Sequence, residues 1–168
     1  MQLNIGDLVV HPAFGIGHLV EIEEKQFSEE GVHLYYKITR LKHSMWIRVE
    51  AQQTSGLRLV TAKSELTHYR DLLKSAPVPL NTNHQQRQLE LVNRLREGSF
   101  QAVCEVMRDL TASGWHKPLG QTDSTTLRKT RDSLYEEWAT AADISTTEAI
   151  KEIDSLLLET RQAYFGPI

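Results

Sequence analysis

Histidine and cysteine are the residue types that most often bind metals or attack substrates, and the chain holds seven histidines and one cysteine. Four histidines are scattered over the first 62 residues: His11, His18, His33 and His43. None of the four has the short spacing of metal ligands, and none is paired with a cysteine or a second histidine at helical spacing, so we predict no metal site. Cys104 adjoins an apolar stripe at helical spacing, which favours a small buried thiol over a nucleophile.

Other signs of catalysis are absent from the sequence. The Gly-Ile-Gly run at 15–17 lacks the following helix and the third glycine of a phosphate loop, so it predicts a turn. No nucleophile, base and oxyanion donor can be assembled from the sequence. We therefore predict a protein that is not an enzyme and that has no cofactor and no small-molecule substrate.

Charge and composition restrict the class of protein. The net charge of −3 disfavours a protein that binds nucleic acids indiscriminately, because such proteins need excess cations. Residues 63–131 hold eleven Lys and Arg against seven Asp and Glu, whereas residues 132–168 hold two against eight. One end of this region could therefore meet phosphate while the other repels it, and two ordinary solvated faces are the alternative.

The cellular compartment follows from three absences. A single cysteine excludes an intramolecular disulfide and is typical of a reducing compartment. The N-terminus has no basic, apolar signal pattern, and no stretch approaches the roughly 20 apolar residues that cross a bilayer. We expect a cytoplasmic protein without membrane attachment.

The first 62 residues have the composition of short strands. Runs of β-branched and aromatic residues, separated by turn residues, occupy 7–10, 17–23, 33–40, 45–49 and 57–60. Apolar and polar residues partly alternate in the third and fourth runs, which is typical of half-buried strands. Five such strands predict a small, strongly bent antiparallel β barrel over residues 1–62. Trp46 lies in one run, and we expect it in the core.

Beyond residue 62 the apolar residues recur at helical spacing. They predict a five-helix bundle over residues 63–168, so the fold class is α+β. Ser99 is expected to cap the third helix, and Ser145 with Glu148 predicts a capping box for the fifth.

Apolar stripes predict which faces of these helices are buried. Leu89, Val92 and Leu95 are expected to form the apolar face of the second helix. Trp138 lies on the stripe of the fourth helix and is expected in the core. Trp115 is expected in a loop between helices, as an exposed contact residue or as a plug between two helices.

Several runs carry a resemblance to a known family. GDLVVHP at 6–12, GIG at 15–17 and VEI at 20–22 resemble the opening of the CarD/CdnL family of bacterial RNA polymerase-binding regulators. Transcription-repair coupling factors share this N-terminal module. The segment from IRVEA at 47–51 to GLR at 56–58 is also similar, with Glu50 where proline is usual.

The helical region extends this resemblance over nearly the full chain. LREGS at 95–99 is similar to the family's Leu-x-x-Gly signature, and VMRDL at 106–110 is similar to its Val-x-Arg-Asp-Leu signature. Both follow the N-terminal module in the family's order.

The resemblance implies a Tudor-like barrel that docks on the β subunit of RNA polymerase. In the family the sheet edge adds to a polymerase strand, so backbone pairing supplies affinity. The matching contact positions here are Lys25, Phe27 and Arg48. A solvated lysine, a core phenylalanine and a strand-face arginine are the alternatives.

The resemblance also implies that the helical domain touches promoter DNA at the upstream edge of the bubble. His84 stands where family members often carry a tryptophan wedge before a basic run, of which Arg87 remains. The wedge should therefore be weaker or missing, and a solvated helix-start residue is the alternative. Arg94 and Arg96 complete the predicted DNA-binding set. DNA binding by the protein alone is expected to be weak and non-specific.

Together these inferences predict a regulator that binds the RNA polymerase β subunit, joins the nucleoid through it, and stabilises the open promoter complex. An adaptor whose helical domain recruits a protein partner, with little DNA contact, is the alternative. The missing tryptophan and the negative net charge favour that alternative. An enzyme, or an RNA-binding barrel protein of the translation machinery, is a third interpretation.

Overall fold

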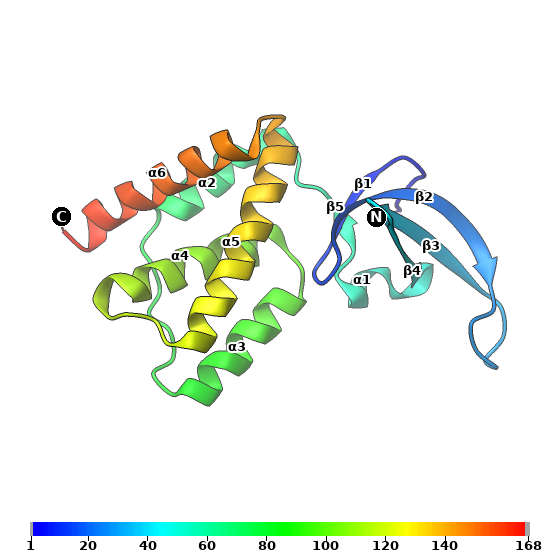
Figure 1. Ribbon diagram of the computed structural model, residues 1–168, viewed down its shortest axis with the longest axis horizontal. Coiled ribbons are helices and arrows are strands. Elements are labelled where there is room, and N and C mark those ends of the chain that lie inside the picture. The colour runs from blue at the N-terminus through cyan, green and yellow to red at the C-terminus, as the bar shows by residue number, and fades with distance from the viewer. Residues whose placement is uncertain (1, 167–168) are drawn as a thin grey trace. The chain divides into compact units, whose positions relative to one another are not determined.

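The computed structural model describes residues 2–166, and the chain divides into two compact units (Figure 1). The β unit holds the residues up to Val60 together with Arg96–Gly98. The helical unit holds Thr61–Leu95 and the residues from Ser99 onward. Among residues 2–166, no helix combines the length and the apolar character needed to cross a membrane.

One five-stranded sheet forms the β unit. The strands lie in the order β4-β3-β2-β1-β5, and all neighbours are antiparallel. They are β1 (Leu8–His11), β2 (Gly15–Lys25), β3 (His33–Arg40), β4 (His43–Arg48) and β5 (Arg58–Leu59). A 3-10 turn (Val49–Ala51) and the short helix α1 (Gln52–Ser55) lead from β4 toward β5. The five predicted antiparallel strands are confirmed, and β4 and β5 are the sheet edges.

Strand alternation divides the side chains of the β unit between a core and an outer face. The buried core consists of Leu3, Val9, Leu19, Tyr36, Ile38, Ile47 and Leu57. Trp46 is only half-buried, so its predicted place in the core is wrong. Neighbouring strand residues point to opposite faces, and Ile47 takes the inward position.

His11 organises the turn between β1 and β2. Its Nδ1 accepts hydrogen bonds from the backbone amides of Ala13 (3.1 Å) and Phe14 (3.2 Å). A ring nitrogen can accept only when it is deprotonated, and burial lowers the pKa of His11. The turn therefore depends on a neutral imidazole.

We expect this turn to make the free energy of unfolding fall when the pH drops below about 6.5, the ordinary histidine pKa. Below that pH, His11 of the unfolded chain takes up a proton. His11 in the folded turn stays neutral until the pH reaches the lowered pKa of the folded state. The stabilisation is therefore complete above that ordinary value and is lost on acidification. His11→Asn offers an amide oxygen that accepts the same backbone amides without titrating, so urea midpoints should depend less on pH. His43→Asn, at an exposed position, is the control, and equal pH dependence in wild type and His11→Asn would contradict this account.

Five helices make up the described part of the helical unit, as predicted. They are α2 (Leu66–Lys74), α3 (His84–Arg96), α4 (Phe100–His116), α5 (Gln121–Ala142) and α6 (Thr146–Tyr164), with a 3-10 turn at Lys63–Glu65 before α2. Both predicted caps are confirmed. The Ser99 hydroxyl accepts from the Ala102 amide, and Ser145 with Glu148 forms a capping box.

The core of the helical unit confirms two predictions and overturns one. Trp138 and Cys104 are fully buried, as expected. Trp115 lies in the last turn of α4 and not in a loop, and it is half-buried. The helix continues past Gly114 and ends before Pro118, because a residue that precedes proline disfavours helical geometry.

The buried face of α3 differs from the predicted one. Leu91 is fully buried, whereas Leu89 and Val92 are 56% and 46% exposed, so the predicted stripe is wrong at these two positions. Polar contacts account for this orientation. Arg87 and Gln88 both donate to the Asp123 carboxylate of α5, and they turn their side of α3 inward beside Leu91.

Two residues of the VMRDL run form a buried ion pair on α4. Arg108 Nε donates to Asp109 Oδ1 over 2.9 Å, and the two residues are only 5% and 3% exposed. Arg108 Nη1 also donates to the Ser75 hydroxyl (2.7 Å) and to the Leu72 carbonyl (3.3 Å). Asp109 Oδ1 accepts from the Val78 amide (3.0 Å). The pair therefore attaches the end of α2 and the following extended segment to α4.

Candidate functional site

Three neighbouring strands of the β unit present a face that the core does not use. The register pairs Tyr35 with Arg48 and Lys37 with Trp46, so alternate residues of β2, β3 and β4 lie side by side. We call this set the outer face; it comprises Glu21, Glu23, Lys25, His33, Tyr35, Lys37, Trp46 and Arg48. Aromatic and charged side chains thus share one sheet surface.

Phe27, just after β2, lies against the outer face and is 59% exposed. Its ring meets Tyr35 edge-on, with 4.9 Å between centroids, and the Trp46 centroid is 6.1 Å away. Lys25 Nζ lies 4.9 Å from the Trp46 ring centroid, within the range of cation–π attraction, and 3.1 Å from Glu23. Phe27 is therefore a surface residue and not a core one. An exposed ring held by aromatic neighbours is a preorganised contact residue.

Arg48, at the end of β4, faces two carboxylates. Its Nη2 is 3.4 Å from Glu30 Oε2, and its Nη1 is 3.7 Å from Glu50 Oε1. Ion pairs of this exposed kind contribute little stability. Arg48 can therefore exchange these partners for a carboxylate of another protein at low cost.

The structure brings the three predicted polymerase-binding residues to one surface. Tyr35 contacts Phe27 and is the register partner of Arg48, and Trp46 lies beside Lys25. Sequence reasoning missed Tyr35 and Trp46 as members of this surface. The two-residue period of strand side chains, counted along β3 and β4 from the predicted contact residue Arg48, was the signal that could have found them. Within residues 2–166, β4 pairs with β3 alone, so its other edge remains open to a further strand.

Two of the predicted DNA-binding arginines are held by carboxylates of neighbouring helices. Arg87 Nε donates to Asp123 Oδ2 over 3.1 Å, and these side chains are 18% and 9% exposed. Arg94 Nη2 lies 3.8 Å from carboxylate oxygens of Glu105 and Asp109 on α4. A DNA phosphate would have to compete with these partners. Neither arginine is thus an unengaged cation.

The other two predicted residues, His84 and Arg96, are exposed at the two ends of α3. His84 Nδ1 lies 3.2 Å from Arg87 Nη2. Between the two ends, Leu89 and Val92 are exposed on the same helix. The solvent side of α3 is therefore apolar in its middle and not a continuous basic track.

The chain also matches known sequence families over both units. Residues 3–60 match the family model "CarD-like/TRCF RID domain", and residues 69–154 match "CarD, C-terminal domain". The chain belongs to the CarD family. It is 30% identical, over 154 residues, to the Bacillus subtilis (strain 168) protein named "Putative transcription factor YdeB". The alignment covers 90% of this chain and 94% of that protein.

Membership of the CarD family confirms the predicted family and supports a role in transcription regulation. The first matched range contains the outer face, and its RID assignment indicates interaction with RNA polymerase in general. The second range contains all of α3. Over residues 2–166, no three His, Cys, Asp or Glu side chains are grouped so that they could hold a metal ion.

Proposed function

We propose that this CarD-family protein binds the β subunit of RNA polymerase and stabilises the open promoter complex without catalysing a reaction. Residues 1–62 supply the polymerase affinity, and residues 63–168 touch promoter DNA. Polymerase binding keeps the protein in the cytoplasm with the nucleoid. The observation that carries the polymerase part is exposed Phe27, gathered with Lys25 and Arg48 on the outer face. Aromatic and arginine side chains dominate binding hot spots, and the open edge of β4 offers backbone pairing.

We expect Phe27→Ala and Arg48→Glu each to weaken binding to the isolated β subunit by roughly tenfold or more, because each removes a hot-spot side chain. Arg48→Gln separates loss of the guanidinium from repulsion by Glu30 and Glu50. Binding of the full chain to immobilised β subunit measures the effect, and unchanged melting temperatures show that the variants fold.

Lys63→Glu, at an exposed position of the helical unit, is the charge-reversal control and should bind as wild type does. If Phe27→Ala and Arg48→Glu also bind as tightly as wild type, the outer face is not the docking surface.

A second function, an adaptor for another protein, is favoured by α3. Arg87 and Arg94 already contact carboxylates, while Leu89 and Val92 expose apolar surface. Such a face suits a protein partner better than phosphate. In this alternative the β unit still binds polymerase, and the helical unit makes little DNA contact.

A further inference from the structure

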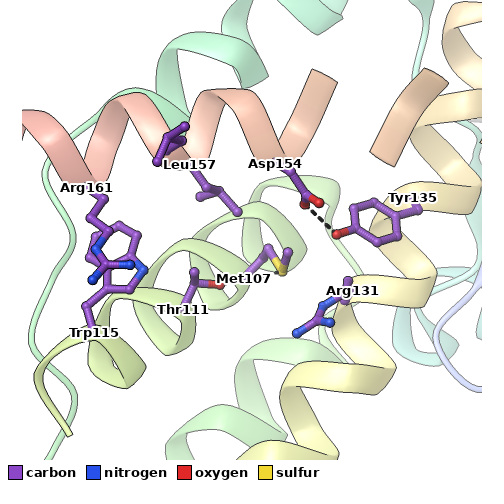
Figure 2. Close-up of a pocket in the computed structure, with 9 residues that line it drawn as sticks. Met107, Thr111, Trp115, Arg131, Tyr135, Asp154, Leu157 and Arg161 are labelled. Atoms are coloured by element: carbon purple, nitrogen blue, oxygen red, sulfur yellow. Dashed lines mark hydrogen bonds between the residues drawn. The ribbon is translucent and has the colours of Figure 1, made fainter. Parts of the chain in front are cut away.

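A pocket of about 320 Å³ opens between α4, α5 and α6 of the helical unit (Figure 2). Trp115 of α4, Arg131 of α5 and Arg161 of α6 contribute its aromatic and cationic lining, and Met107 and Leu157 its apolar wall. This volume lies at the lower end of the range for small-molecule sites. No residue of the pocket belongs to the outer face or to α3, so the proposed function does not use it.

Arg161 differs from the other half-buried or buried arginines of this unit. Those arginines each contact a carboxylate: Arg70, Arg87, Arg94 and Arg108. Among residues 2–166 no carboxylate lies within 4 Å of Arg161, and its buried Nε has no hydrogen-bond partner. The guanidinium instead lies beside the Trp115 ring (Figure 2), 5.9 Å from its centroid, and 5.5 Å from the ring centroid of Phe165. A buried donor without an acceptor is costly, so an acceptor from a ligand would be favoured here.

The opposite side of the pocket supplies a hydrogen-bond acceptor. The Tyr135 hydroxyl donates to Asp154 Oδ1 over 2.7 Å, and this bond is drawn in Figure 2. Burial and the bond to Asp154 raise the pKa of Tyr135 far above its ordinary value, so the hydroxyl stays protonated and holds Asp154 in place. A fixed carboxylate repels a bare anion, but it accepts an N–H or O–H group of a ligand. The pocket thus discriminates among anions.

We propose that this pocket binds a small nucleotide-like organic anion, which combines a planar ring, one anionic group and hydrogen-bond donors. The anionic group pairs with Arg161, whose buried Nε lacks an acceptor, while Arg131 lies on the other side of the pocket, near Tyr135 (Figure 2). The ring packs against Trp115 and the apolar wall, and Asp154 accepts a donor of the ligand. The anionic group, the ring and the hydrogen-bond donor of the ligand would thus each contact a different part of the pocket lining.

The test uses the full chain with 8-anilinonaphthalene-1-sulfonate, a fluorescent aromatic anion, as the probe. Arg161→Met keeps the length of the side chain and removes the guanidinium, so it should weaken one-to-one probe binding by about tenfold or more, the loss of a charge-assisted hydrogen bond. Arg128→Met, on an exposed arginine of α5 outside the pocket lining, should bind the probe as wild type does. Arg161→Gln also removes the positive charge and provides the same test if Arg161→Met does not fold.

Competition then defines the ligand class. Guanosine monophosphate should displace the probe. Guanosine and inorganic phosphate at the same concentration should not, because guanosine lacks the anionic group and phosphate lacks the ring. The proposal is overturned if folded Arg161→Met or Arg161→Gln binds the probe as wild type does, or if inorganic phosphate or guanosine alone displaces the probe as well as guanosine monophosphate does. None of these measurements involves polymerase, so they stand apart from the test of the proposed function.

Discussion

Arg108→Met should destabilise the protein by roughly 3–5 kcal/mol, because it leaves the Asp109 carboxylate buried without its ion partner. Asp109 is 3% exposed, and it cannot regain solvent while its Oδ1 accepts the Val78 amide. Arg94 lies 3.8 Å from Asp109 Oδ2 and compensates only in part, so the lower end of that range is the expected value. Urea unfolding of the full chain measures the change.

A matched double variant separates buried charge from lost packing. In Asp109→Asn the side-chain oxygen can still accept the Val78 amide, but no charge remains to be compensated. Arg108→Met should therefore cost distinctly less in that background than in wild type. Arg128→Met, an exposed substitution, should change stability by less than about 0.5 kcal/mol. Equal costs of Arg108→Met in the two backgrounds would show that packing, and not the ion pair, sets the effect.

His84→Trp should lengthen the lifetime of the open promoter complex by about tenfold, because an indole stacked on an unpaired base contributes about 1–3 kcal/mol. His84 begins α3 and is exposed, so the larger ring can be accommodated without disturbing the core. His84→Ala should shorten the lifetime modestly, since imidazole offers less stacking surface. The measurement is the decay of the polymerase–promoter complex after a competitor is added.

Gln85→Trp is the matched control for this prediction. Gln85 is also exposed, but it lies about 100° further around the helix, so its ring would point elsewhere. Lifetimes that do not respond to His84→Trp or to His84→Ala would mean that His84 does not face DNA. The exposed Leu89 and Val92 would then make the adaptor the better account of the helical unit.

Local patterns were sufficient to predict the five strands and the five helices of the helical unit, but neither the short helix α1 nor the direction in which each element faces. The five strands and five helices follow from spacings of two and of three to four residues. The orientation of α3 does not, because it depends on Asp123, which lies 36 residues beyond Arg87. Trp46 shows the same limit on a smaller scale. Either it or Ile47 could have pointed inward, and membership of a strand run does not decide between them.

The candidate site, too, could be predicted only in part from the sequence. The resemblance supplied Lys25, Phe27 and Arg48 one by one, whereas their meeting around Tyr35 and Trp46 depends on the pairing of β3 with β2 and β4. Arg87 and Arg94 are basic residues by type, but their carboxylate partners lie on other helices. Whether a cation is available to phosphate is a property of tertiary packing, and no single helix encodes it.

The open edge of β4 also exposes the protein to self-association. Its six residues leave one side of a strand without a partner in the described part of the chain, and such an edge can template pairing with any extended segment, including that of a second copy. Lys42 in the preceding turn and Arg48 at the strand end place a cation near each end of this edge. Arg48 already faces Glu30 and Glu50, however, so its charge is compensated and these cations do not by themselves keep two copies apart. Pairing of β4 with a strand of another protein, as the proposed function requires, would therefore also cover the edge at which two copies could associate.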